Sequence, residues 1–131
     1  KSEPSAYSWD QMVRDQKTGW SGVRNHLAKK NMQEMQLGDE CFFYHSNDGR
    51  EIVGIVRVSK LYHPDPSDKT GTFGMVEVSV LKPLPKPVTL ADIKALSQLK
   101  DMALVRQSRL SVSPVTAAEW RAIYALGRIT Q

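Results

Sequence analysis

The chain has 131 residues, 40% of them hydrophobic, and a formal net charge of +4 at pH 7. This size suits a domain with a substantial core, so we expect a single domain over residues 1–131. No apolar run approaches the ~20 residues of a membrane span, and a lone cysteine, Cys41, excludes an internal disulfide and a multi-cysteine metal site.

These features also limit location and partners. The sequence shows no secretory signal, so we expect a cytoplasmic protein with no membrane partner and no cofactor, and a monomer. The positive charge permits contact with nucleic acid without requiring it, because many proteins with neutral ligands are equally basic.

The first predicted helix begins at a capping box in which Ser8 is the N-cap and Gln11 completes the box. Trp9 shares a helix face with apolar residues three and four positions on, so we expect it in the core. A second short helix is predicted over residues 25–35 and ends at the turn over residues 37–39.

Strands are predicted next. Residues 40–45 and 51–61 form two strands joined by a hairpin at 46–49, where Asp-Gly suits a positive φ. Residues 62–72 are expected to be an exposed loop, since two prolines remove ladder donors. A third strand is predicted over residues 73–81.

The last third mixes short elements. Three prolines over residues 83–87 predict a stiff extended connector. A Thr-capped helix over 89–96 and a short strand over 110–112 are expected to follow. A second capping box opens a helix over 116–127 that ends at its glycine. The pattern predicts an α+β domain.

Reaction chemistry is not evident in the sequence. Three histidines and fourteen acidic residues are present, but no metalloprotease, nucleophile-elbow, P-loop or dinucleotide motif. Cys41, His45 and Ser46 form the nearest candidate nucleophilic group. Side chains alternate along a strand, so His45 and Ser46 point to opposite faces and cannot pair directly. We expect a protein that is not an enzyme.

The segment Gly19-Trp20-Ser21-Gly22-Val23-Arg24-Asn25 contains the groups that a planar, polar-edged ligand needs. Trp20 offers a flat face, and Asn25 offers both a donor and an acceptor. The alternative is a core tryptophan followed by the start of a helix.

Four blocks in this order resemble the EVE domain of the PUA-like superfamily: Lys1-Ser2-Glu3-Pro4, residues 19–25, Phe42-Phe43-Tyr44-His45-Ser46, and residues 106–112. The resemblance runs from Lys1 to about Leu126. It implies a small PUA-like mixed β-barrel or curved sheet flanked by short helices. It also implies a pocket for a modified base in DNA or RNA, without catalysis.

The resemblance also implies which residues form that pocket, with Trp20 stacking on the base and Asn25 and Ser46 reading its polar edges. The implied set is Trp20, Ser21, Val23, Arg24 and Asn25 from the first part, Tyr44, His45 and Ser46 from the middle, and Arg106, Ser108, Arg109 and Leu110 from the last. Where relatives often carry a tryptophan, this chain has Phe73-Gly74-Met75.

Alternatives remain for several residues and for the function. Arg24 and Arg109 can pair with acids such as Glu3 or Asp39, and Tyr44 can belong to the core. Glu3 can mark a strand exit or accept an amino group from a base. The same pocket would also serve a binder of free nucleotide metabolites or a small-molecule enzyme, and an interaction scaffold is a third function.

Overall fold

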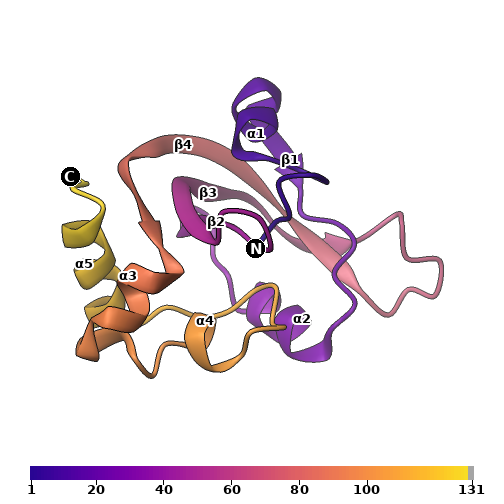
Figure 1. Cartoon of the computed structure of the whole chain (residues 1–131). Coiled ribbons are helices and arrows are strands. Elements are labelled where there is room, and N and C mark those ends of the chain that lie inside the picture. Colours follow the sequence, from indigo (N-terminus) through magenta and orange to yellow (C-terminus); the bar gives the residue numbers. More distant parts are fainter. Residues whose placement is uncertain (130–131) are drawn as a thin grey trace.

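The computed structural model describes residues 1–129, which form an α+β fold around a four-stranded sheet (Figure 1). In chain order the elements are α1 (Trp9–Asp15), β1 (Lys17–Gly19), α2 (His26–Gln33), β2 (Glu40–His45), β3 (Glu51–Pro64), β4 (Gly74–Thr89), α3 (Leu90–Ala95), the 3-10 helix η1 (Ser97–Leu99), α4 (Ala103–Arg106) and α5 (Ala117–Leu126). The strand order is β1-β4-β3-β2, and neighbouring strands are antiparallel. The sheet is curved and open, which confirms the expected α+β class.

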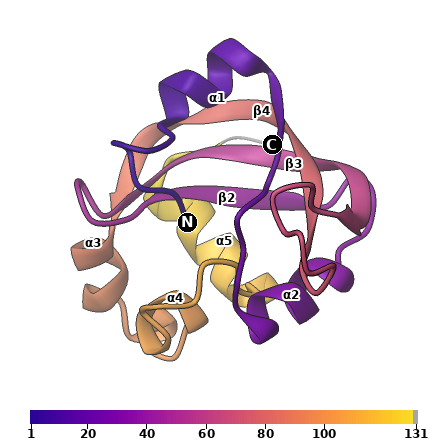
Figure 2. The same ribbon diagram turned by 90° about the vertical axis from the view of Figure 1, so that its right-hand side faces the viewer.

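The curvature comes from the long β3–β4 pair. Its register shifts at four places along the pairing, including the step between Val58 and Lys60. Each such bulge bends the strand and increases its twist. Figure 2 shows the result, with the strands wrapping across the molecule and helices above and below them.

Both long strands extend further than the sequence predicted. β3 continues to Pro64, which pairs with Gly74, so the expectation that residues 62–64 leave the sheet is wrong. Pro64 is the last residue of its strand, and its missing N–H therefore removes no interior ladder bond. Chain reversal begins only at the buried Asp65.

The proline segment 83–87 is extended, as predicted, but it is part of β4 and not a free connector. Pro83 pairs with Gly54, and Val88 pairs with Ile52. On its other side β4 pairs with β1 at residues 77–79, and one backbone bond at each end extends this cover to Val76 and Val80. Beyond that point it is an edge strand, where proline is tolerated. The N–H of Lys86 donates to the carbonyl of Gly127 at 3.2 Å, which covers part of this edge.

The predicted helices are confirmed because their signals are local. Ser8, Thr89 and Thr116 each cap a helix in a complete capping box. The helix predicted over 25–35 is α2, capped by Asn25. The short elements β1, η1 and α4 carry no comparable sequence signal, and the sequence did not predict them.

The strand predicted over residues 110–112 is wrong: this segment is irregular. Its carbonyls are bound by groups that lie outside any sheet. The main-chain nitrogen of Lys1 donates to the carbonyl of Ser111 at 2.9 Å, and Nδ2 of Asn31 donates to the carbonyl of Val112 at 2.8 Å. With these partners, the backbone needs no ladder.

Two buried clusters stabilise the sheet. One contains Trp9 and Phe43, and the other contains Tyr44 and Ile123. Phe43 and Tyr44 are consecutive in β2 yet enter different clusters, as strand alternation predicts. Within residues 1–129, no helix is long and apolar enough to cross a membrane.

Candidate base-binding site

A cavity of about 380 Å³ lies between the N-terminal segment and the loop that joins β1 to α2. This volume falls within the roughly 300–1,000 Å³ of ordinary small-ligand pockets. The N-terminal segment, β1, the loop after it and one residue of the last third line it: Lys1, Ser2, Glu3, Ala6, Tyr7, Thr18, Gly19, Trp20, Ser21, Gly22, Val23, Arg24 and Ser111. Figure 2 shows the N-terminus in front of β2, on the same side as the segment leading to α2.

The N-terminal wall is held by two distant parts of the chain. The main-chain N–H of Ser2 donates to the carbonyl of Tyr44 at 2.8 Å, and the N–H of Ser46 donates to the carbonyl of Ser2 at 2.9 Å. On the other side, Nζ of Lys1 donates to the carbonyl of Ser108 at 2.7 Å. The middle and last predicted blocks therefore support this wall through their backbones.

Trp20 lines the cavity from the loop that joins β1 to α2. Its main-chain N–H donates to the carbonyl of Val76 at 2.8 Å, which continues the β1–β4 pairing by one bond. Its half-buried indole meets Phe43 edge-on, with ring centroids 5.6 Å apart. Trp20 also lines a second, largely apolar cavity of about 440 Å³ that extends along the sheet and includes Phe43 and Trp120. The side chain of Trp20 therefore contributes to the lining of both cavities.

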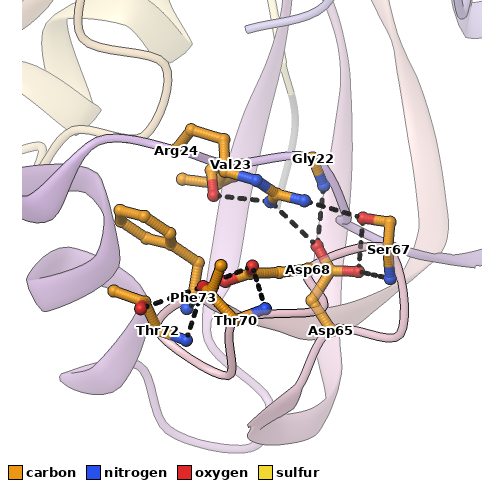
Figure 3. Close-up of polar contacts among 9 residues, drawn as sticks. All are labelled: Gly22, Val23, Arg24, Asp65, Ser67, Asp68, Thr70, Thr72 and Phe73. Carbon is orange, nitrogen blue, oxygen red and sulfur yellow. Dashed lines mark hydrogen bonds and ion pairs between the residues drawn. The ribbon is translucent and has the colours of Figure 1, made fainter.

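The loop after Trp20 is fastened to the loop between β3 and β4. One carboxylate oxygen of Asp65 accepts from the N–H of Gly22 at 2.8 Å and from Nη1 of Arg24 at 3.4 Å. The other oxygen accepts from the N–H and hydroxyl of Ser67 at 2.8 and 2.7 Å (Figure 3). Burial opposes ionisation of Asp65, but the hydrogen bonds from Ser67, Gly22 and Arg24 outweigh it and lower its pKa to about 2.

The guanidinium of Arg24 is thereby occupied by hydrogen bonds within the protein. Its Nη1 donates to the carbonyl of Val23 as well as to Asp65, and its Nη2 donates to the hydroxyl of Ser67. The guanidinium also lies 5.9 Å from the ring centroid of Phe73. The predicted pairing of Arg24 with an acid is confirmed in kind, but the partner is Asp65 and not Glu3 or Asp39.

A sequence model of the EVE domain matches residues 1–126. The chain belongs to the EVE domain family. This EVE domain is 33% identical to thymocyte nuclear protein 1 of Homo sapiens over 134 residues, which cover 85% of this chain and 60% of the relative. It thus spans less than two thirds of the length of that relative. The curved sheet with short helices is the PUA-like arrangement that the sequence predicted for the family.

Solved structures extend the comparison. A Rhodopseudomonas palustris protein is 50% identical, with a TM-score of 0.93 over 99% of this EVE domain and 91% of that chain. The human THYN1 protein in complex with 5-methylcytosine containing DNA is 29% identical, with a TM-score of 0.84 over 93% of this chain and 86% of that one.

The predicted site residues of this EVE domain fall into two groups. Trp20, Ser21, Val23 and Arg24 line the 380 Å³ cavity. Those that do not line it are Asn25, Tyr44, His45, Ser46, Arg106, Ser108, Arg109 and Leu110. Of the second group, Tyr44, Ser46 and Ser108 bind the N-terminal wall through their backbones.

Asn25, expected to read a base edge, has another role in the structure. Its Oδ1 accepts from the N–H of Ala28 at 2.9 Å and so caps α2. Tyr44 is 7% exposed and packs in the core, as its structural alternative predicted. Leu110 is 4% exposed and packs in the cluster that contains Trp9.

His45 and Cys41 are not arranged for catalysis. Nε2 of His45 accepts from the main-chain N–H of Trp9 at 3.0 Å, which requires that nitrogen to be unprotonated. Burial lowers the pKa of His45, and nearby Glu51 and Asp10 only partly offset this effect. Burial also raises the pKa of the Cys41 thiol to about 11, which disfavours the reactive thiolate. Residues 1–129 contain no cluster of three or more potential metal ligands.

The two arginines of the last block lie on the exposed segment at the end of α4. Arg106 pairs with Asp101, whereas no hydrogen bond or ion pair within residues 1–129 engages Arg109. Arg109 follows Ser108, whose carbonyl binds the Lys1 side chain at the cavity wall. Arg109 is thus the freer of the two cations.

The predicted set of site residues leaves out Tyr7 and Glu3, which line the cavity, and Asp65, which lies beside it. Tyr7 lines the cavity, and its hydroxyl donates to Asp15 at 2.7 Å. Glu3 also lines it, and within the described chain its exposed carboxylate has no hydrogen-bond or salt-bridge partner. The sequence offers Glu3 as a strand exit or as an acceptor for a base, because it stands in the first block. Asp65 gave no sequence signal, because it lies 43 positions from the glycine that it binds.

Proposed function

We propose that this EVE domain binds a modified cytosine in DNA and that the base, turned out of its stack, enters the 380 Å³ cavity. The observation that carries the proposal is that one cavity is lined both by the aromatic ring of Trp20 and by Glu3, whose carboxylate has no hydrogen-bond or salt-bridge partner within residues 1–129. The human THYN1 complex with 5-methylcytosine containing DNA supports it, because that protein shares this fold with a TM-score of 0.84.

Each lining residue has chemistry that suits cytosine. Trp20 supplies an aromatic surface for the ring. The Glu3 carboxylate can accept from the exocyclic amino group, a pairing typical of cytosine recognition. The exposed hydroxyl of Ser21 can donate a hydrogen bond to the base or accept one from it. The buried side chain of Val23 is an apolar surface for a methyl group.

Energetics determine which contacts must discriminate between bases. Extruding a base costs a few kcal/mol, and a stack on an aromatic ring returns ~1–3 kcal/mol. Stacking on Trp20 alone therefore roughly offsets the cost of extrusion. Contacts from Glu3, Ser21 and Val23 must supply the preference for a modified base over an ordinary one.

The domain acts, in this proposal, as a reader that leaves the base unchanged. His45 is engaged by the backbone of Trp9, and the Cys41 thiol is held protonated, so neither is a prepared nucleophile or base. Mass spectrometry of an oligonucleotide recovered after incubation is expected to show an intact base. A product that a His45→Ala variant fails to form would overturn the reader function.

The direct test is the affinity for short oligonucleotides that carry one 5-methylcytosine, against unmodified DNA, the matching RNA and the free modified nucleoside. We expect the modified DNA to bind most tightly. Trp20→Ala should weaken this binding about 5- to 150-fold, since the lost stack is worth ~1–3 kcal/mol.

Trp120→Ala is the matched control. Trp120 is also half-buried and stacks on Phe42 with ring centroids 3.9 Å apart, so its loss should lower stability while leaving affinity near wild type. Equal affinity of Trp20→Ala and wild type, with both tryptophan variants destabilised alike, would show that Trp20 is only structural. A free nucleoside that binds as tightly as the oligonucleotide would identify a metabolite binder.

A further inference from the structure

The carboxylate of Asp65 is the best satisfied acidic group beside the cavity, although it lies outside the cavity lining. Asp65 is 2% exposed, and its two oxygens together receive four hydrogen bonds. Two of the donors, Gly22 and Arg24, belong to the cavity wall. The other two belong to Ser67 in its own loop. The carboxylate thus joins two loops that are far apart in sequence (Figure 3).

In the loop from Trp20 to Arg24, the middle residue Gly22 is held by its bond to Asp65. Trp20 is tied to β4 by its N–H, and Val23 is buried, but Ser21 and Gly22 between them are exposed. Gly22 has a φ of +80° and open space where a side chain would be. This conformation is freely available to glycine but is only one of many that glycine can adopt.

We propose that Asp65 is a positioning residue for base recognition: it fixes the loop from Trp20 to Arg24 in the conformation that receives the base. This inference rests on the proposed function. A wall that is already fixed loses less conformational freedom on binding, so more of the contact energy appears as affinity. Contacts that select the modification require the most accurate placement, and the loss of Asp65 should therefore reduce selectivity.

Asp65→Asn tests the charge and the acceptors with almost no change of shape. Gly22 and Arg24 donate to one oxygen, and Ser67 donates to the other. In the variant, the side-chain NH2 group replaces one of the two oxygens. Because this group is itself a donor, it faces other donors at either oxygen position. The variant must break at least one bond between the loops or within its own loop, whichever way the amide turns.

Asp68→Asn is the matched control in the same loop. The carboxylate of Asp68 accepts from the N–H and hydroxyl of Thr70 and from the N–H of Phe73, at 2.9, 2.6 and 2.7 Å. These bonds lower the pKa of Asp68 to about 2, as for Asp65. Asp68 makes no hydrogen bond to the loop from Trp20 to Arg24, so it reports the cost of loosening the β3–β4 loop alone.

The measurement is the ratio of affinities for a modified and an unmodified oligonucleotide, made first on the wild type. Asp65→Asn should weaken modified-DNA binding about 10-fold, the usual consequence of losing one hydrogen bond to a charged group, and bring the ratio toward one. Asp68→Asn should keep the ratio. A variant that is merely less stable would lose affinity for both oligonucleotides in the same proportion.

The amide NMR signal of Gly22 gives a reading of the loop that does not depend on DNA. In Asp65→Asn this signal should move and its hydrogen exchange should accelerate, while Asp68→Asn leaves both close to wild type. A wild-type ratio near one would refute the proposed function itself. A wild-type preference that persists once the Gly22 signal is altered, in Asp65→Asn or in Asp65→Ala, which removes both acceptor oxygens, would overturn the positioning role alone.

Discussion

At the scale of single residues, Asn25 shows how capping and recognition can compete for one side chain. Its Oδ1 is used by the N–H of Ala28 at the start of α2. The remaining amide group is exposed and lies outside the cavity lining. We infer that Asn25 acts first as a helix cap, because an unmade cap bond costs stability whether or not a ligand is present.

Two substitutions separate these roles. Asn25→Ala should lower the free energy of unfolding by about 1 kcal/mol, while Asn25→Ser keeps a capping oxygen and should stay near wild type. Chemical denaturation measures both. We expect Asn25→Ser to bind modified DNA as well as wild type. A loss of affinity in Asn25→Ser at unchanged stability would instead show that Asn25 contacts an edge of the base.

At the scale of elements, the docking of α1 depends on close contact between a glycine in β3 and an indole. A Cβ built on Gly54 would lie 2.3 Å from the Trp9 ring, far inside normal contact. Trp9 is 8% exposed and meets Phe43 edge-on at 5.3 Å. The N–H of Trp9 is also fixed by His45. The helix therefore cannot shift without breaking other contacts.

Gly54→Ala should accordingly lower the free energy of unfolding by about 1–3 kcal/mol, the usual range for overpacking. Urea denaturation gives the value. In a Trp9→Leu background the added methyl group meets a smaller neighbour, and the cost of Gly54→Ala should shrink. An equal cost in both backgrounds would place the strain in the β3 backbone and not at the indole.

At the scale of the whole molecule, the net charge is +4, but some of the cationic side chains are already bound within the protein and are not free to contact a nucleic acid. Arg24 is bound to Asp65 and Ser67, and Arg106 pairs with Asp101. Arg109 and Lys1 lie on the segments that close the cavity. Phosphate contacts position a nucleic acid, whereas base contacts specify it. We therefore expect few phosphate contacts and a shallow dependence of affinity on salt.

Arg109→Gln should make the slope of log affinity against log salt shallower by about 0.7 for a single strand, the amount expected for one phosphate contact. The preference for the modified base should persist. Arg121→Gln on α5 carries the same change of charge outside the cavity lining and should leave the slope unchanged. Equal slopes for wild type and Arg109→Gln would mean that Arg109 touches no phosphate.

Helix boundaries could be predicted from the sequence because a cap is decided within about one turn. The boxes at Ser8, Thr89 and Thr116 each lie within four consecutive residues. The alternation that separates Phe43 from Tyr44 is equally local. Strand ends could not be predicted this way. Whether proline ends a strand depends on whether the missing N–H faces a neighbour, and only the sheet shows that residues 83–87 lie on an edge.

The sequence by itself determined the α+β class, the main helices and the tryptophan loop, all of which depend on neighbouring residues. Only the tertiary structure decided what faces that loop. Asp65 binds Gly22 across 43 positions, and Lys1 binds Ser111 across 110. Hydrogen bonds are selected by distance and direction in space, and a sequence carries neither until the sheet has curved and brought these segments together.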